Sequence, residues 1–127
     1  MVNDLISDLI VRIKVGLIVK KKIIYVLNSK LVFKVLSKLT ELGYIYNFKV
    51  INFKYIKLHL KYVNNCNVIR NILRVSKLSN RKYVSIKKLK KNYNFQGFYL
   101  LSTNKGLLTD EEALYFNIGG EILLYII

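Results

Sequence analysis

The chain has 127 residues, enough for one compact domain or two very small ones. Hydrophobic residues make up 53% of it. Charges interrupt them so often that no stretch approaches the roughly 18 to 20 apolar residues of a membrane span, and we expect no transmembrane segment. A net charge of +15, from 22 Lys and Arg against 7 Asp and Glu, points instead to an acidic partner.

Cysteine and histidine usage limits the chemistry further. Cys66 is the single cysteine and His59 the single histidine, so the sequence offers neither an intramolecular disulfide nor the ligand set of a zinc site. No nucleophile can be paired with a base, and the carboxylates at 110–112 follow one another at a helix start, where a structural role accounts for them. We therefore expect no enzyme activity, no cofactor, no metal and no small-molecule substrate.

The basic residues are concentrated where acidic ones are missing. No Asp or Glu occurs between Glu41 and Asp110, an interval that carries fourteen Lys and Arg. A polyanion approaching it meets little repulsion, which is typical of nucleic-acid-binding proteins. A basic surface for anionic lipid is the competing interpretation. The charges alternate with apolar residues and do not lie on one strongly amphipathic helix, which favours nucleic acid and no membrane contact.

A helix is predicted at the start of the chain. Asn3 can cap it, and apolar residues recur on one face at the spacing of a helix. Its later turns carry Arg12 and Lys14, which either contact phosphate or remain solvated. The apolar face consists of Leu5, Ile6, Leu9, Ile10 and Ile13.

A short strand and a second helix follow. The strand covers residues 23–26, Asn28 or Ser29 can cap the helix, and Gly43 ends it. Apolar residues again recur at helical spacing, which predicts a buried face. We expect this face to consist of Leu31, Val35, Leu39 and Leu42.

From Tyr44 to Tyr62 the apolar residues alternate with a period of two, which indicates strands. The sequence therefore predicts an α-β-α-β-β module over residues 1–63. One face of its sheet should pack on the helices and the other should meet water or a polyanion. The apolar face consists of Ile56, Leu58 and Leu60, and the charged face of Lys57, His59 and Lys61.

The polar cluster 64–67 marks the expected domain boundary, and residues 64–127 are predicted to form a β-rich module with one short helix. Two strands, 68–75 and 83–86, flank a turn at 77–80. A basic run on a loop or a single helical turn then either tracks a phosphate backbone or forms a solvated face. It consists of Lys87, Lys88, Lys90 and Lys91. The predicted fold class is α+β in two small modules.

The richest chemistry lies between Ser102 and Glu121. A buried strand, 98–101, leads into a loop, 102–106, that places hydrogen-bonding groups at the strand's end. A short helix is then predicted from Thr109, whose hydroxyl can form a capping box with Glu112.

Gly119 and Gly120 are predicted to end this helix. An apolar strand, 122–127, follows Glu121. If it pairs beside residues 98–101, it brings the two glycines and Glu121 back to the loop.

This loop suits RNA. Its hydroxyl and amide groups can bond base edges and the ribose 2′-OH, its lysine supplies charge, and its glycine lets a backbone come close. Glu121 is expected to orient a hydroxyl or to accept from a base amino group. Alternatively, Gly119 and Gly120 only form a turn and Glu121 is solvated. The loop residues are Ser102, Thr103, Asn104, Lys105 and Gly106.

Five segments resemble, in register, the small-subunit ribosomal protein eight family. They are NDLISDLIVRIK, SKLVFKVLSKLTELGYIYNF, LHLKY, RVSKLSNRKYV and STNKGLLTDEEALYFNIGGE. The chain departs from the family at two points. Asn104 stands where the family has a second loop serine, and Leu78 with Ser79 where it has a Pro-Gly turn.

The resemblance implies a structural protein that binds an irregular helix of the central domain of small-subunit rRNA directly, supports subunit assembly and translation, and contacts neighbouring ribosomal proteins. It implies that the loop 102–106 and residues 119–121 form the main recognition site. The segments flanking that site supply Arg74, Ser76, Lys77, Arg81 and Tyr83. The remaining candidate rRNA-binding residues are Lys87, Lys88, Arg12, Lys14 and Lys30.

Two other functions stay open at this point: a peripheral protein that binds polyanions or membrane surfaces, and a structural subunit without RNA contact of its own. Lys far outnumbers Arg in this chain. Asn, Ile and Tyr are abundant, and Pro and Trp are absent. A/T-rich genes favour such a composition. The amino terminus shows no secretory or transit pattern. We therefore expect an organelle ribosome, mitochondrial rather than plastid.

Overall fold

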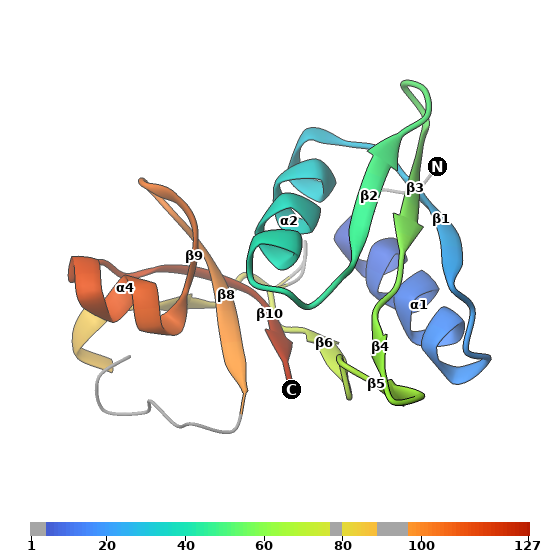
Figure 1. Cartoon of the computed structure of the whole chain (residues 1–127). Helices are drawn as coiled ribbons and strands as arrows, with labels where there is room; N and C mark the ends of the chain where they lie inside the picture. Colours follow the sequence, from blue (N-terminus) through green and yellow to red (C-terminus); the bar gives the residue numbers. More distant parts are fainter. Residues whose placement is uncertain (1–4, 77–79, 89–96) are drawn as a thin grey trace. The chain divides into compact units, whose positions relative to one another are not determined.

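A computed structural model describes residues 5–76, 80–88 and 97–127 of the chain. It divides the chain into two compact units, Met1–Arg70 and Asn71–Ile127, called unit 1 and unit 2 below (Figure 1). The boundary expected between residues 63 and 64 falls inside a hairpin of unit 1. Among the described residues, no helix has the length and apolar character needed to cross a membrane.

Unit 1 consists of a three-stranded sheet and two helices, with a small hairpin after them. Its first five elements are α1 (Leu5–Ile18), β1 (Ile23–Leu27), α2 (Lys30–Glu41), β2 (Asn47–Val50) and β3 (Tyr55–His59). Strand β3 lies between β1 and β2 and pairs antiparallel with both. The expected α-β-α-β-β order is therefore confirmed. Alternate residues of β3, Ile56 and Leu58, are fully buried, as the period of two predicts.

Helix α2 begins and ends as expected, but its buried face is displaced. The Ser29 hydroxyl caps it by accepting a hydrogen bond from the Val32 amide at 3.1 Å, and Gly43 follows its end at φ +85°. Leu31 and Leu42, expected in the core, are 38% and 36% exposed. The expectation was wrong there because the sheet covers a neighbouring stripe, on whose edge both leucines lie. That stripe consists of Val32, Val35, Leu36 and Leu39.

The polar cluster after β3 forms the turn of a hairpin between β4 (Tyr62–Val63) and β5 (Cys66–Asn67). Asn64 and Asn65 have φ values of +53° and +63°, and positive φ at both central residues is typical of a type I′ turn. Asparagine tolerates this conformation better than most residues, which explains the repeated amide side chains.

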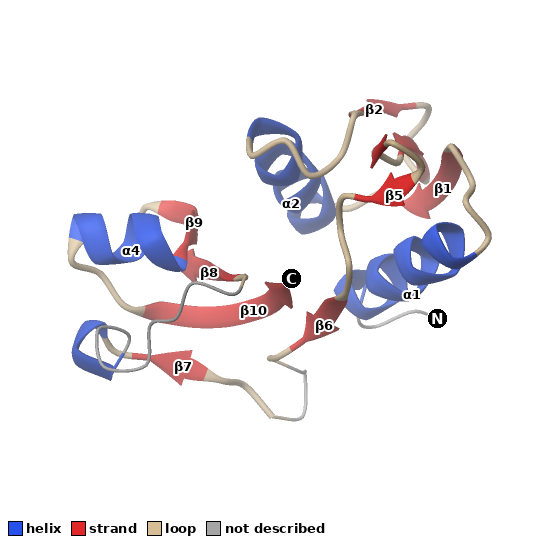
Figure 2. Cartoon of the chain, turned by 60° about the horizontal axis from the view of Figure 1, so that its bottom comes forward, coloured by secondary structure: helices blue, strands red, loops and turns tan. Residues whose placement is uncertain are grey.

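In its described residues, unit 2 contains a five-stranded antiparallel sheet and the short helix α4. Its elements are β6 (Ile72–Arg74), β7 (Tyr83–Val84), β8 (Phe98–Thr103), β9 (Gly106–Thr109), α4 (Asp110–Phe116) and β10 (Gly120–Ile126). Strand β10 is the long strand that crosses unit 2 in Figure 2. It pairs with β8, confirming the expected return of the last strand. With unit 1, this confirms the α+β class.

Strands β6 and β7 differ in length from the two strands that the sequence predicts around a turn at 77–80. Both are shorter than expected, and each pairs with β10. Residues 77–79 of the predicted turn lie outside the described residues. Residues 86–88 are helical, while Lys90 and Lys91 of the predicted basic run lie outside the described residues. The alternation of apolar residues predicts a strand but not its partner, because pairing is decided by distant segments.

Helix α4 has the predicted capping box. The Thr109 hydroxyl accepts from the Glu112 amide at 3.2 Å, and the Glu112 carboxylate accepts from the Thr109 amide at 3.1 Å. The helix ends at Asn117 in the left-handed conformation, with φ +59°, so the expectation that Gly119 and Gly120 end it was wrong. The two glycines instead lie where β10 begins, which gives them another role.

Candidate nucleic-acid interface

Gly119 and Gly120 allow three strands to meet at one end of the sheet. Gly120 stands opposite Val84 of β7, and the next residue of β10 stands opposite Ser102 of β8. A Cβ on Gly120 would collide with the Ser102 carbonyl and lie 2.9 Å from Cγ2 of Thr103. A Cβ on Gly119 would collide with the Val84 carbonyl. Glycine is therefore required at both positions for backbones to approach this closely.

The Glu121 carboxylate organises side chains from the segment between β6 and β7. It accepts a hydrogen bond from the Ser76 hydroxyl and another from the Arg81 guanidinium at 2.9 Å. The Ser76 hydroxyl, fully buried, also accepts from the Lys82 amide at 3.1 Å. Glu121 thus orients a hydroxyl, that of Ser76, and the Glu121 side chain is only 16% exposed.

The charge of Glu121 is stabilised by the same contacts. Partial burial by itself raises the pKa of this carboxyl. The hydrogen bonds from Ser76 and Arg81, together with the positive charges of Arg81 and Arg74, outweigh that effect, so the pKa lies below its ordinary value. At neutral pH the group is an anion held by cations, and it therefore repels an approaching phosphate less than a free carboxylate would.

The polar loop is shorter than expected. Ser102 and Thr103 belong to β8, and only Asn104 and Lys105 form the tip between Thr103 and its partner Gly106. The Thr103 hydroxyl donates to the Gly106 carbonyl at 2.8 Å and accepts from the Lys105 amide at 3.1 Å. It therefore holds the turn together, which sequence reasoning missed when it assigned this hydroxyl to RNA alone.

Gly106 completes the turn in a conformation that suits glycine, with φ +98° and nothing within 4 Å of a Cβ built on it. The ammonium group of Lys105 lies 4.9 Å from the centre of the Phe116 ring on α4. A cation at this distance is attracted to the ring face. The hairpin tip and the helix are thus linked, and Lys105 presents its charge beside an aromatic surface.

The structure brings together a subset of the predicted site residues. At the end of β10 where the glycines lie, β7 contributes the exposed Tyr83, β8 contributes Ser102, and the Glu121 network adds two further side chains. Lys87 and Lys88 are exposed shortly after β7. This group, which we call the β10 site, consists of Ser76, Arg81, Tyr83, Ser102, Gly119, Gly120 and Glu121.

Other predicted residues lie elsewhere. Asn104 and Lys105 are at the hairpin tip, and Arg74 is a β6 residue that donates to the Leu123 carbonyl at 3.3 Å. Lys77 lies outside the described residues. Lys14 of α1 is half-buried and Lys30, the first residue of α2, is exposed; both belong to unit 1.

Arg12 has a structural role in unit 1. Its guanidinium pairs with the Asp8 carboxylate at 2.8 Å and donates to the Tyr25 carbonyl at 3.0 Å. The contact with Tyr25 connects α1 to β1. Because both contacts use guanidinium N–H groups, fewer donors remain to bind a phosphate. Neither contact was predicted from the sequence, and the Tyr25 carbonyl belongs to another element.

Comparisons with known proteins identify the family of this chain. A sequence profile of the family described as ribosomal protein S8 matches residues 4–127. The small ribosomal subunit protein uS8m of Acanthamoeba castellanii is 46% identical, over 96% of this chain and 98% of that protein. The uS8 protein of Aliarcobacter butzleri is 40% identical, over 97% of both. The uS8c protein of Gracilaria tenuistipitata var. liui is 37% identical, over 99% of both. The resemblance carried by the five sequence segments is thereby confirmed, and the chain belongs to the ribosomal protein S8 family.

Proposed function

We propose that this protein is a structural constituent of the small ribosomal subunit that binds small-subunit rRNA directly and supports subunit assembly and translation. Family membership supports the structural role in the subunit, and three relatives are named small ribosomal subunit proteins. Its partners are then the rRNA of the central domain and neighbouring ribosomal proteins, with no membrane and no catalytic step.

The observation that supports direct RNA contact best is the hydrogen-bond network of the β10 site. Glu121 holds Ser76 and Arg81 in place beside the strand that carries Ser102. Side chains fixed in this way lose little entropy when they bind, so their hydrogen bonds contribute more to affinity. The exposed guanidinium of Arg81 suits a phosphate, and the Ser102 hydroxyl suits a base edge or a 2′-OH.

The charges of unit 2 also favour a polyanion, because its carboxylates are engaged in the fold. Asp110 is 3% exposed and accepts from the Glu111 amide at 2.9 Å, and Glu112 belongs to the capping box. Glu121 is paired with Arg81. Among the acidic side chains in the described residues of unit 2, only Glu111 is exposed and lacks one of these structural contacts.

The proposed target is an irregular RNA helix. A regular A-form helix hides its base edges in a deep, narrow groove, so a compact set of hydroxyls reads bases only where bulges or triples open the helix. Lysines contact phosphate in both forms and supply affinity without this discrimination.

We also propose a mitochondrial ribosome as the location. The A/T-biased residue usage supports an organelle gene, and the Acanthamoeba castellanii relative is a mitochondrial uS8. The plastid-type relative from Gracilaria tenuistipitata var. liui is less similar, at 37% against 46% identity.

The experiment that tests the function uses the full chain and a small-subunit rRNA fragment that contains the irregular central-domain helix. Affinity measured by filter binding should fall steeply with salt, because each neutralised phosphate adds slightly under one unit to the slope of log K against log salt. Ultraviolet crosslinking should attach the RNA to the β10 site.

A slope near zero, or crosslinks confined to unit 1, would show that the proposed site is wrong. Flotation with anionic liposomes at moderate salt checks the remaining possibility of a membrane-surface protein. Co-sedimentation that survives nuclease treatment would instead indicate a subunit protein held by its protein neighbours.

A further inference from the structure

A second basic and aromatic surface lies in unit 1 and shares no residue with the β10 site, which belongs to unit 2. It is a groove of about 460 Å³ between the start of α2 and the turn that joins β2 to β3. This volume is in the range of pockets that hold small molecules or single nucleotides. The groove is lined by Asn28, Ser29, Lys30, Phe33, Lys34 and Phe53.

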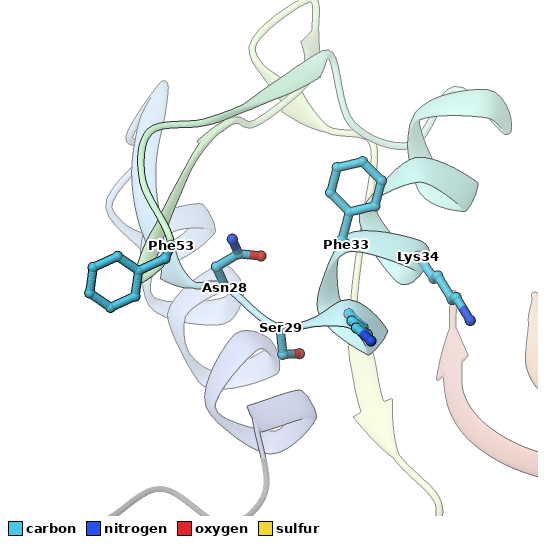
Figure 3. A pocket seen from close by; sticks show the side chains of 6 residues that line it. Asn28, Ser29, Phe33, Lys34 and Phe53 are labelled. Atoms are coloured by element: carbon cyan, nitrogen blue, oxygen red, sulfur yellow. The ribbon is translucent and has the colours of Figure 1, made fainter.

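Two phenylalanines on opposite sides of this groove are exposed to solvent. Phe53 is 91% exposed and Phe33 is 44% exposed. Figure 3 shows the two rings on either side of Asn28 and Ser29, which form the floor between them. Phe33 also contacts the half-buried Phe48 ring edge to face, with ring centres 5.3 Å apart. The Phe33 ring is therefore supported by β2, whereas the Phe53 ring is almost fully exposed.

The turn that carries Phe53 is held in a fixed position. The Asn52 side chain accepts hydrogen bonds from the amides of Lys54 and Tyr55, at 2.8 and 2.9 Å. Asn28 on the floor donates from its backbone to the Lys54 carbonyl at 2.8 Å and from its side chain to the Asn52 carbonyl at 3.3 Å. The ring is thus presented by a turn that is fastened to the groove, and little ordering is needed when something binds.

The charged residues that line the groove favour an anionic ligand. Lys30 and Lys34 are one helical turn apart on α2, both exposed, and neither forms an ion pair within the described part of the chain. Two like charges at this spacing repel each other, and a bound anion removes that repulsion. None of the six lining residues is acidic.

Aromatic rings beside lysines suit one class of ligand in particular. An unpaired nucleotide offers a flat base that stacks on aromatic side chains and a phosphate that attracts ammonium groups. A partner protein would need an interface of roughly 1,000 Å² or more, and apolar rings between two lysines suit an anionic ligand better than an apolar one. The groove therefore matches a nucleotide better than a protein surface.

We propose that this groove, the Phe33–Phe53 groove, binds an unpaired nucleotide of RNA, with the base against the two rings and the phosphate beside Lys30 and Lys34. The proposal rests on the proposed function in that it assumes an RNA partner. It adds a second contact that reads single-stranded RNA, on a different unit from the β10 site.

The test uses a fluorescent reporter in the groove of the full chain. The protein contains no tryptophan, so Phe53→Trp introduces a single one at a site exposed enough to accept it. Hexauridylate and hexaadenylate should quench its fluorescence, because a stacked base shields and quenches an indole. A blunt RNA duplex and inorganic polyphosphate should not, since neither offers an unpaired base.

Substitutions then assign the contact to named side chains. In the reporter background, Phe33→Leu should weaken oligonucleotide binding roughly 5- to 100-fold, the range expected for one stacked base. Because Phe33 also supports Phe48, folding is checked by circular dichroism. Phe53→Ala, which changes an almost fully exposed ring, should weaken binding of labelled hexauridylate in the same range. Tyr46→Ala, 67% exposed in the same unit outside the groove, is its matched control and should change little.

The lysines are tested in the same way. Lys30→Gln and Lys34→Gln should each weaken binding about 2- to 5-fold, as expected for an exposed charge pair. Lys49→Gln, an exposed lysine on β2 that does not line the groove, is the matched control and should have a smaller effect.

A final variant separates this proposal from the function proposed above. Gly120→Val added to the reporter should damage the β10 site and leave quenching of Trp at position 53 unchanged. Quenching by polyphosphate as strong as that by hexauridylate would overturn the proposal, since charge would then suffice. The proposal would also be overturned if neither oligonucleotide quenched the fluorescence, or if Gly120→Val abolished the quenching. Both outcomes are independent of the affinity of the chain for rRNA. Quenching by a small-subunit protein instead would assign the groove to a protein partner.

Discussion

The Ser76 hydroxyl donates a hydrogen bond to the Glu121 carboxylate, although 45 residues separate them in the sequence. This contact joins the segment after β6 to the start of β10. Because Ser76 is fully buried and also accepts from the Lys82 amide, the two residues fix the backbone that leads to Arg81 and β7. The arrangement of the β10 site therefore depends on one carboxylate.

Replacing that carboxylate should destabilise the protein in a pH-dependent way. The pKa of Glu121 is lower in the folded chain than its ordinary value of 4.5, so the ion stabilises the fold above that pH, and this contribution is lost as the pH falls through the folded-state pKa. Glu121→Gln should cost about 1 to 3 kcal/mol at pH 7. Thermal melts of both proteins should converge as the pH falls below the folded-state pKa of Glu121.

The titration of Asp110 has the opposite effect on stability but does not disturb this comparison. Burial raises the pKa of its carboxyl, so the contribution of Asp110 to stability is greatest below its ordinary pKa and is lost as the pH rises through the folded-state value. Asp110 is present in both proteins and cancels in their difference. A difference between the two melts that grows with acidification would contradict the assignment of Glu121 as the stabilising anion.

Gly120→Ala should reduce both stability and RNA affinity. Its Cβ would collide with the Ser102 carbonyl, which is backbone and cannot rotate away, so β8 and β10 must separate. A cost of about 1 to 3 kcal/mol is expected for such overpacking, measured by urea unfolding alongside filter binding.

Gly106→Asn is the matched control for this glycine. There is open space around a Cβ at Gly106, and asparagine tolerates its positive φ. If Gly106→Asn damaged RNA binding more than Gly120→Ala, the hairpin tip and not the glycine pair would be the recognition element.

Ser102→Ala should lower affinity for an irregular RNA helix while leaving a regular duplex nearly unaffected. If the hydroxyl bonds a base edge or 2′-OH, its loss costs about 1 to 3 kcal/mol on the irregular helix. The measurement is filter binding of both RNAs at one salt concentration. Equal losses on both RNAs would mean that Ser102 gives no discrimination.

Two comparison variants sharpen this result. Lys87→Ala should lower affinity for both RNAs by similar factors, because phosphate is present in each. Thr103→Ala removes the hydrogen bonds that close the turn, so it should loosen the hairpin and show faster amide exchange at Lys105. A Thr103 effect on RNA without any change in exchange would restore the direct role first expected for this hydroxyl.

Thr109→Ala should destabilise unit 2 by about 0.5 to 2 kcal/mol, because it removes the cap of α4. Thr40→Ala is a suitable control. Its hydroxyl donates to the Leu36 carbonyl inside α2, a contact that contributes little to stability. Chemical unfolding under the same conditions should give a clearly lower free energy of unfolding for Thr109→Ala than for Thr40→Ala.

Local features of the fold were predictable from the sequence because their causes are local. The capping box of Thr109 and Glu112, the Ser29 cap and the alternation of Ile56 and Leu58 each depend on residues within a few positions of one another. The pairing of the last strand with β8 could be anticipated because both are strongly apolar and only the short elements β9 and α4 separate them.

Features that depend on distant partners were not predictable. Strand β9, Gly106–Thr109, is too short for its apolar residues to show a period, and it exists because β8 pairs with it. The end of α4 at Asn117 was not predicted because Gly119 and Gly120, just beyond it, are more typical helix-ending residues. The Ser76–Glu121 contact and the ties between Asn28 and the turn at Asn52 join segments that have no common local pattern.

The central position of β10 has a consequence for the order of folding. Strands β6, β7 and β8 all hydrogen-bond to β10, yet β10 follows each of them in the chain. Within the described part of the chain, β6 and β7 therefore find their partner only after β10 has been made, whereas the described strands of unit 1 all precede unit 2 in the chain. Unit 1 can fold first, and unit 2 closes late and in one step. The surface assembled by Glu121 is then created only after β10 has been made, and a nascent chain without β10 cannot display it.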